Sequence, residues 1–385
     1  MKRKLTVAGL VMAGLLTAGT ASAGEHQAAS EAAGWLAKQL TADGTLENPF
    51  GGPLPDYGLM IDTLFALHAA GHDAQAAPIA TYLDEKRHAT DYYTWDALVP
   101  NQGYDAIITA GATAKVLVAA EVSGHNPRAF GGHDMVAETK ATIPRSGPDK
   151  GRVSDYSKNP DFQDMVSNNA NMFGQALAVI GLAGVGENDR LALDTMLTQQ
   201  CSEGYFRIFF AHDPTGQRIA TCDEGKATGA SAPDNDTTGL ALSALLAARD
   251  AGATGLGAPI ARAVSWLKAH QTASGGWGGG VGTEAANTNS TGLVVQALAD
   301  AGGAGQAVSR GTAYLKSAQV NRKADAGNAL RDQIGAIAYT PEEYVAARES
   351  GIGSVDTWIR AGAQATLGLA QVGFHDLTRN CIRHP

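Results

Sequence analysis

The chain has 385 residues, of which 44% are hydrophobic, 6% aromatic and 17% charged, and its formal net charge is −9. An acidic chain of this kind lacks the basic surface that nucleic acids and anionic membranes require, so we expect neither as a partner. The length suits one large domain or two ordinary ones.

The first 23 residues have the pattern of a secretory signal peptide. Lys2-Arg3-Lys4 is a basic start, residues 5–16 are mostly apolar, and Ala21-Ser22-Ala23 is a small-residue cleavage site. The apolar run is shorter than the roughly 20 residues of a membrane anchor. We therefore predict cleavage after Ala23, secretion without stable membrane insertion, and a net charge that goes from −9 to −12 because three cations are removed.

A helical unit recurs six times in the rest of the chain. An apolar helix, usually opened and closed by Gly, is predicted at residues 58–71, 111–124, 174–186, 239–252, 292–302 and 358–373. A more amphipathic helix is predicted at residues 28–40, 75–88, 133–143, 188–200, 256–271 and 306–319. Such pairs can close into a ring. We predict an all-α fold, an α6/α6 toroid of six inner and six outer helices, in a single domain at residues 24–385.

An insertion between the third and fourth repeats predicts a β-hairpin around residues 204–222. Residues alternate on both sides of the turn sequence Asp213-Pro214-Thr215-Gly216. In an oxidising compartment, Cys201 and Cys222 are a plausible disulfide across this insertion, and Cys381 is left over. We expect the hairpin to overhang the mouth of the ring, and residues 321–354 to form a second lid.

Metal-binding motifs are missing from the sequence. It has no CxxC and no HExxH pattern, and its ten His residues are scattered. We expect no metal and no cofactor.

Some outer helices end in a turn with the pattern Q-xxx-G-x-W. Gln271, Gly275 and Trp277 match it fully, and residues 200–206 are a weaker copy. Gly permits a tight reversal, and the Gln amide can bond to backbone groups left free at a helix end. We interpret these residues as structural.

The segment Asp234-Asn235-Asp236-Thr237-Thr238 precedes the fourth inner helix. With this segment and the turn at Gln271, the chain resembles the terpenoid cyclase and protein prenyltransferase superfamily of α/α toroids. Squalene-hopene cyclases, with their prenyltransferase/squalene oxidase repeats, carry such turns. Class II cyclases carry a D-x-D-D or D-x-D-T-T motif whose middle Asp protonates an alkene. The resemblance implies that Asp236 is this acid and that Asp234 holds it protonated and oriented.

A helix cap is the competing interpretation of the two carboxylates. Asn287-Thr288-Asn289 precedes the fifth inner helix, and Asn169-Ala170-Asn171 precedes the third, each ahead of the same Gly. Asn and Asp are both preferred at helix N-termini because their oxygens accept backbone N–H bonds. Only the fourth repeat, however, has Asp at both positions, and an Asn amide cannot donate a proton as a carboxylic acid can.

Three observations weigh against a cyclase. The chain is predicted to be exported, whereas isoprenoid diphosphates and squalene are made inside cells. Many class II sites lie between two toroids, and this chain has one. A cation cascade needs a cavity dense in aromatics, and the inner helices are poor in them. The same superfamily includes transcobalamin-type binding proteins. The leading hypothesis is therefore a secreted protein that binds a small hydrophobic or corrinoid-like ligand, and a cyclase acting on an isoprenoid substrate is the alternative. The candidate ligand-binding residues are Asp62, Asn171, Phe173, Thr238, Asn289 and Trp358.

A third hypothesis is a polysaccharide-active enzyme, because α/α toroids also host glycosidases and lyases. Such enzymes need paired carboxylates or a Tyr/His/Arg set in a cleft. Candidates near the predicted rim are Asp62, Tyr104, Asp105, His212 and Asp356.

Overall fold

The computed structural model describes residues 21–49, 51–85, 88–94 and 107–381. In these ranges all regular secondary structure is helical, and extended segments meet only at isolated bridges. The predicted all-α class is therefore confirmed. No helix in this part of the chain is long and apolar enough to cross a bilayer. The predicted signal peptide lies outside the described residues except for its last three positions.

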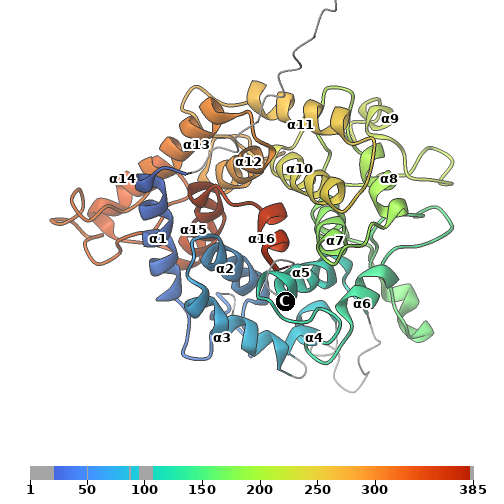
Figure 1. The fold of residues 1–385 in the computed structure, drawn as a ribbon, viewed down its shortest axis with the longest axis horizontal. Coiled ribbons are helices and arrows are strands. Elements are labelled where there is room, and N and C mark those ends of the chain that lie inside the picture. Colours follow the sequence, from blue (N-terminus) through green and yellow to red (C-terminus); the bar gives the residue numbers. More distant parts are fainter. Residues whose placement is uncertain (1–20, 50, 86–87, 95–106, 382–385) are drawn as a thin grey trace, which may run out of the picture.

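Six helices form an inner ring around the centre of the molecule (Figure 1). Each packs against the next along the chain, and the last packs against the first, which closes the ring. In α10 every residue from Thr237 to Ala248 is buried, as expected for a helix that is apolar on most faces. The six are α2 (Tyr57–Ala69), α5 (Ala110–Val122), α7 (Met172–Gly184), α10 (Asn235–Asp250), α12 (Thr288–Ala301) and α15 (Val355–Ala370).

Six further helices surround this ring, and each packs on an inner helix. They are α1 (Ala23–Ala37), α3 (Asp73–Asp84), α6 (Met135–Ala141), α8 (Arg190–Thr198), α11 (Gly257–Ala269) and α13 (Gly305–Ser317). The predicted α6/α6 toroid is confirmed. The remaining helices are α4 (His88–Tyr93), the 3-10 helix η1 (Pro160–Met165), α9 (Cys222–Lys226), α14 (Pro341–Ser350) and α16 (Phe374–Cys381).

Glycines at the starts of the inner helices let their backbones approach closely. A Cβ atom on Gly174 would lie 3.0 Å from the Cα atom of Gly111 in the neighbouring helix. A Cβ atom on Gly292 would lie 2.3 Å from the carbonyl oxygen of Gln364. The repeated Gly of the sequence is therefore a packing requirement of the ring.

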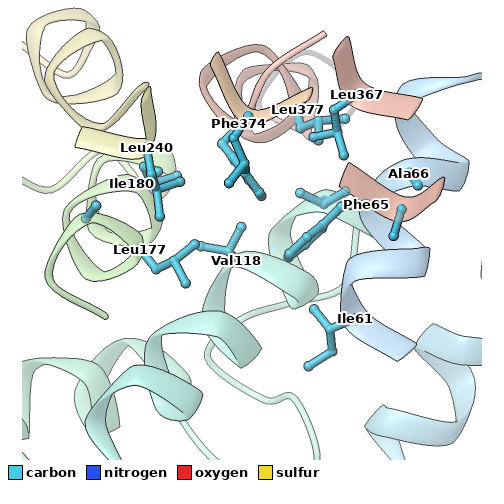
Figure 2. Close-up of a cluster of buried hydrophobic side chains, with 14 of the residues drawn as sticks. Ile61, Phe65, Ala66, Val118, Leu177, Ile180, Leu240, Leu367, Phe374 and Leu377 are labelled. Atoms are coloured by element: carbon cyan, nitrogen blue, oxygen red, sulfur yellow. The ribbon is translucent and has the colours of Figure 1, made fainter. Parts of the chain in front are cut away.

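The C-terminal helix α16 lies inside the ring, which the repeat pattern did not predict (Figure 1). It packs against α5, α7 and α10. Phe374 meets Phe65 edge to face, with the ring centroids 5.2 Å apart. Figure 2 shows Phe374 and Leu377 beside Phe65 and Leu367 in the centre of the ring. This helix therefore fills part of the space inside the ring.

Gln turns tie some of the outer helices to the next, as at the end of α11. Gln271 donates from Nε2 to the carbonyl oxygens of Gly275 (2.7 Å) and Ala307 (2.8 Å). Trp277 is fully buried and donates from its indole nitrogen to the carbonyl oxygen of Leu267. Gly275 has φ +94°, and a Cβ atom there would lie 2.7 Å from the backbone oxygen of Arg310. The turn thus depends on Gly and on the Gln amide together.

A further copy of this turn closes the ring and is not visible as a motif in the sequence. Gln319 donates to the carbonyl oxygens of Ala28 in α1 (2.8 Å) and of Gly335 (3.4 Å). Gly335 has φ +95°, and a Cβ atom there would lie 2.0 Å from the backbone oxygen of Glu31. The last outer helix, α13, is therefore joined to the first by the same device that joins α11 to α13.

The predicted β-hairpin is wrong in detail, although the predicted disulfide is confirmed. Cys201 and Cys222 are bonded. Instead of two strands, one isolated bridge joins His212 and Ile219. The backbone upstream of the turn bonds elsewhere, since the carbonyl of Ile208 accepts from the N–H of Met172. The downstream arm turns into α9 at Cys222, so neither arm is left to form a strand.

Candidate functional site

Two cavities are lined by residues of the inner helices and of the segments that connect them. The larger, of about 490 Å³ and here called the central cavity, is lined by all six inner helices, including residues Asp62, Lys115, Asn171, Phe173 and Leu240. The second, of about 480 Å³ and here called the acid pocket, is lined by residues 207–211, 229–230, 232–234, 280–281, Phe173, Asp236 and Thr283. Phe173 lines both cavities. Residues 321–354, expected to form a second lid, line neither cavity.

Asp234 is the N-cap of α10. Its Oδ1 atom accepts the backbone N–H of Thr237 at 2.9 Å, and the residue is 5% exposed. Burial raises the pKa of this carboxyl, and the N–H of Thr237 acts in the opposite direction. The first Asp of the motif therefore caps the helix, and the second is not needed for this role.

Asp236 is positioned differently from Asp234. Its Oδ1 atom is buried and has no hydrogen-bond partner among the described residues. Burial, followed by the charge of Asp234, raises the pKa of Asp236 to about 7, and a hydrogen bond with Ser290 only partly offsets this. A carboxyl group with this pKa holds a proton near neutral pH and can donate it.

A glycine-rich loop after Trp277 covers the two carboxylates. A Cβ atom on Gly279 would lie 2.5 Å from Oδ2 of Asp236, and one on Gly280 would lie 2.3 Å from Oδ2 of Asp234. Asn235 holds this loop by donating from Nδ2 to the carbonyl of Gly278 at 2.9 Å. This loop was not predicted, although the run Gly278-Gly279-Gly280 is a signal in the sequence for a segment that passes close to its neighbours.

The sister repeat keeps the geometry and changes the chemistry. Asn287 caps α12 by accepting the N–H of Ser290 at 2.8 Å, as Asp234 does in α10. Asn289, two residues on, has a buried Oδ1 atom without a hydrogen-bond partner in the described part of the chain, as Asp236 does. In α7 the cap is the second Asx, Asn171, which accepts the N–H of Phe173 at 3.0 Å.

The structure divides the predicted ligand-binding residues into two groups. Asp62, Asn171 and Phe173 line the central cavity. Thr238, Asn289 and Trp358 line neither cavity.

Two of these three residues have structural bonds instead. The hydroxyl of Thr238 accepts the N–H of Phe206 and donates to the carbonyl of Asp234. The indole nitrogen of Trp358 donates to Glu343 at 2.7 Å. Thr291 repeats the role of Thr238, accepting the N–H of Trp277.

The candidates for carbohydrate chemistry are not brought together. Asp62 pairs with Lys115 at 2.7 Å, His212 lies 3.1 Å from Asp149, and Asp356 pairs with Arg360 at 3.1 Å. Tyr104 and Asp105 lie outside the described residues. Each of these three described residues therefore has a separate partner, and they do not form the paired carboxylates that a glycosidase needs.

One cluster in the described ranges has the spacing of metal ligands. It consists of Cys201, Glu203 and Asp223. Because Cys201 is in the disulfide it offers no thiolate, and both carboxylates are ion-paired with Lys226. The cluster is therefore explained without a metal.

The ring of inner and outer helices is similar in fold to solved structures that include a type II terpene cyclase and an unsaturated glucuronyl hydrolase. The type II terpene cyclase MstE from Scytonema matches with a TM-score of 0.54 at 12% identity, over 90% of this chain and 98% of that chain. The unsaturated glucuronyl hydrolase of Bacillus sp. GL1 matches with a TM-score of 0.54 at 13% identity, over 90% and 96%. A protein from Actinoplanes matches with a TM-score of 0.55 at 16% identity, over 90% and 99%. No family model and no curated relative matches the sequence. At these identities the likeness concerns the fold.

Proposed function

We propose that this protein is an isoprenoid cyclase that starts its reaction by protonation, with Asp236 as the general acid. The observation that carries the proposal is the Oδ1 atom of Asp236, which is buried and unpartnered among the described residues, on a carboxyl whose pKa is raised to about 7. The N-cap role that competed for this motif belongs to Asp234. Asp236 is therefore not needed as the cap, and its Oδ1 atom has no other partner in the described part of the chain.

The acid pocket suits an alkene substrate. Its lining is mainly apolar, with three phenylalanines, Phe173, Phe209 and Phe210, and its volume is typical of small-molecule sites. The faces of aromatic rings carry the negative end of a quadrupole and stabilise a passing cation. The sequence interpretation found few aromatics on the inner helices, but two of these three come from the insertion.

In the proposed reaction the O–H bond of Asp236 breaks and its proton adds to one alkene carbon, leaving a tertiary cation on the other. A second alkene of the same chain attacks this cation, which forms a C–C bond and closes a ring. Loss of a proton to water from the final cation gives the product, and Asp236 regains a proton from water. Substrate and product are isomers. Asp234 remains hydrogen-bonded to the N–H of Thr237 and fixes the start of α10.

The presence of a single toroid does not weigh against a cyclase. The MstE chain, described as a type II terpene cyclase, matches this chain over 98% of its length, so a single toroid accounts for nearly all of it. Because the signal peptide predicts export, the substrate must be available outside the cytoplasm.

Binding without turnover is the second candidate, and the observation that favours it is the central cavity of about 490 Å³. Cavities of about 300–1,000 Å³ hold drug-sized molecules, whereas a corrinoid is much larger. In this candidate the ligand is a small hydrophobic molecule, and neither Asp234 nor Asp236 acts on it. Cavity binding with no product from any isoprenoid would favour it.

The test compares Asp236→Asn with a matched control in the sister repeat, Asn289→Ala. Purified wild-type protein is incubated with farnesyl and geranylgeranyl alcohols, diphosphates and phenol conjugates, and extracts are analysed by gas chromatography with mass spectrometry. Cyclic isomers are expected from the wild type and from Asn289→Ala. Asp236→Asn should form at least a hundredfold less product, the scale of a lost general acid. Equal product from both variants would refute the acid role.

A further inference from the structure

The walls of the central cavity differ in polarity. Apolar side chains of Phe65, Leu177, Leu240, Leu367 and Phe374 line one part of it, and all five lie in the centre of the ring in Figure 2. Another part is polar and includes Asp62, Tyr92, Lys115, Asp155 and Asn169. An occupant that matches this division has an apolar body and one polar end.

The polar part has no spare positive charge. Lys115 is the only cation among the described lining residues, and it donates to Asp62 at 2.7 Å and to the carbonyl of Gly58 at 2.9 Å. Burial alone would lower the pKa of Lys115, but the neighbouring Asp62 raises it, so Lys115 keeps its charge. Asp155 adds a negative charge held by the backbone N–H groups of Ala110 and Asn169.

The acid pocket likewise offers no cation to an anionic ligand. Its one cationic lining residue in the described ranges is Arg207, which is 1% exposed. The guanidinium donates to Gln199, Ser231 and the carbonyl of Ala220. A diphosphate would therefore meet the carboxyl of Asp234 in one cavity and those of Asp62 and Asp155 in the other, with no free cation among the described residues of either lining. Like charges in such confined sites repel strongly.

We propose that the substrate is an uncharged isoprenoid with a hydroxyl or phenol at one end, and that Lys115 and Asp62 bind this end in the central cavity. The inference rests on the proposed function and specifies its substrate class. A hydroxyl can accept the third N–H of Lys115, whose other two are used by Asp62 and Gly58, and can donate to an Asp62 carboxylate oxygen. The hydrocarbon chain passes Phe173, which lines both cavities, and brings its far alkene to Asp236.

The test measures binding on the Asp236→Asn background, where the probe is not consumed. Farnesol and farnesyl diphosphate are titrated by calorimetry, with and without Mg²⁺. Farnesol is expected to bind at least tenfold more tightly than the diphosphate. Asp62→Asn, which leaves Lys115 unpaired, is expected to shift this ratio at least tenfold toward the diphosphate. Tighter binding of the diphosphate to the Asp236→Asn protein with Asp62 intact would overturn the inference.

A second variant tests where the ligand lies. Ala112→Phe adds a ring to the wall of the central cavity and is expected to weaken farnesol binding at least tenfold. Ala77→Phe, at an exposed position of α3, is the control and should leave binding unchanged. Unchanged farnesol binding in Ala112→Phe would overturn the placement. Product formation that depends on Asp236 but not on Asp62 or Ala112 would leave the acid role intact and refute this inference alone.

Discussion

Replacing Asp236 by Asn should stabilise the protein at high pH and leave its stability unchanged at low pH. The pKa of Asp236 is about 7 in the folded protein against 3.8 for an ordinary Asp. The folded state therefore binds the proton more tightly, and its stability falls as pH rises from about 4 through 7. Each unit of difference corresponds to about 1.36 kcal/mol, so the full loss is on the order of 4 kcal/mol. An Asn amide has the same shape and does not ionise.

Urea unfolding at pH 5 and pH 8 measures this effect. The free energy of unfolding of Asp236→Asn should exceed that of the wild type by about 2–4 kcal/mol at pH 8. At pH 5 the difference should be much smaller. Asp332→Asn, whose carboxylate is 81% exposed, is the control and should differ little from the wild type at either pH. A destabilised Asp236→Asn at both pH values would mean that the carboxylate is held by bonds like a cap, and the reasoning would be wrong.

Three further predictions follow from the same structure. Product formation should fall about tenfold per pH unit above pH 7 in a pH–rate profile, because the acid form of Asp236 is lost there; a flat profile up to pH 9 would contradict this. Gly280→Ala places a Cβ atom 2.3 Å from the carboxylate of Asp234, so it should lower the melting temperature and abolish product, and wild-type values for both would refute the close approach. Gln319→Ala leaves the carbonyl of Ala28 without its hydrogen bond and should lower the free energy of unfolding in urea by about 1–3 kcal/mol. An unchanged free energy of unfolding would mean that ring closure depends on apolar contacts alone.

The sequence predicted the ring because each repeat carries its own periodic signal. Apolar residues at helical spacing and a Gly at each end locate an inner helix without reference to the rest of the chain. The ring-closing turn lacked such a signal, because Gln319 and its Gly335 are 16 positions apart rather than 4 as in the turn at Gln271. The plug α16 belongs to no repeat, so periodicity could not place it in the centre of the ring.

The role of Asp236 depended on a detail that the sequence does not contain. The cap is the first Asx in α10 and α12 but the second in α7, where Asn171 has this role. An alignment on the following Gly cannot distinguish these cases, because the start of the helix can shift by two residues. The polar part of the central cavity was equally hidden, since Lys115 and Asp155 come from separate segments and meet only in the closed ring.

The position of Asn289 has a consequence for how such proteins can diverge. A change from Asn to Asp needs one nucleotide substitution, and Asn289, like Asp236, has a buried Oδ1 atom without a hydrogen-bond partner among the described residues. The scaffold therefore contains a second position at which a buried carboxyl can arise without any change of backbone. Because Asn289 lines neither cavity, a reactive centre can move from one repeat to the next only if the loops around the new position also open a cavity there.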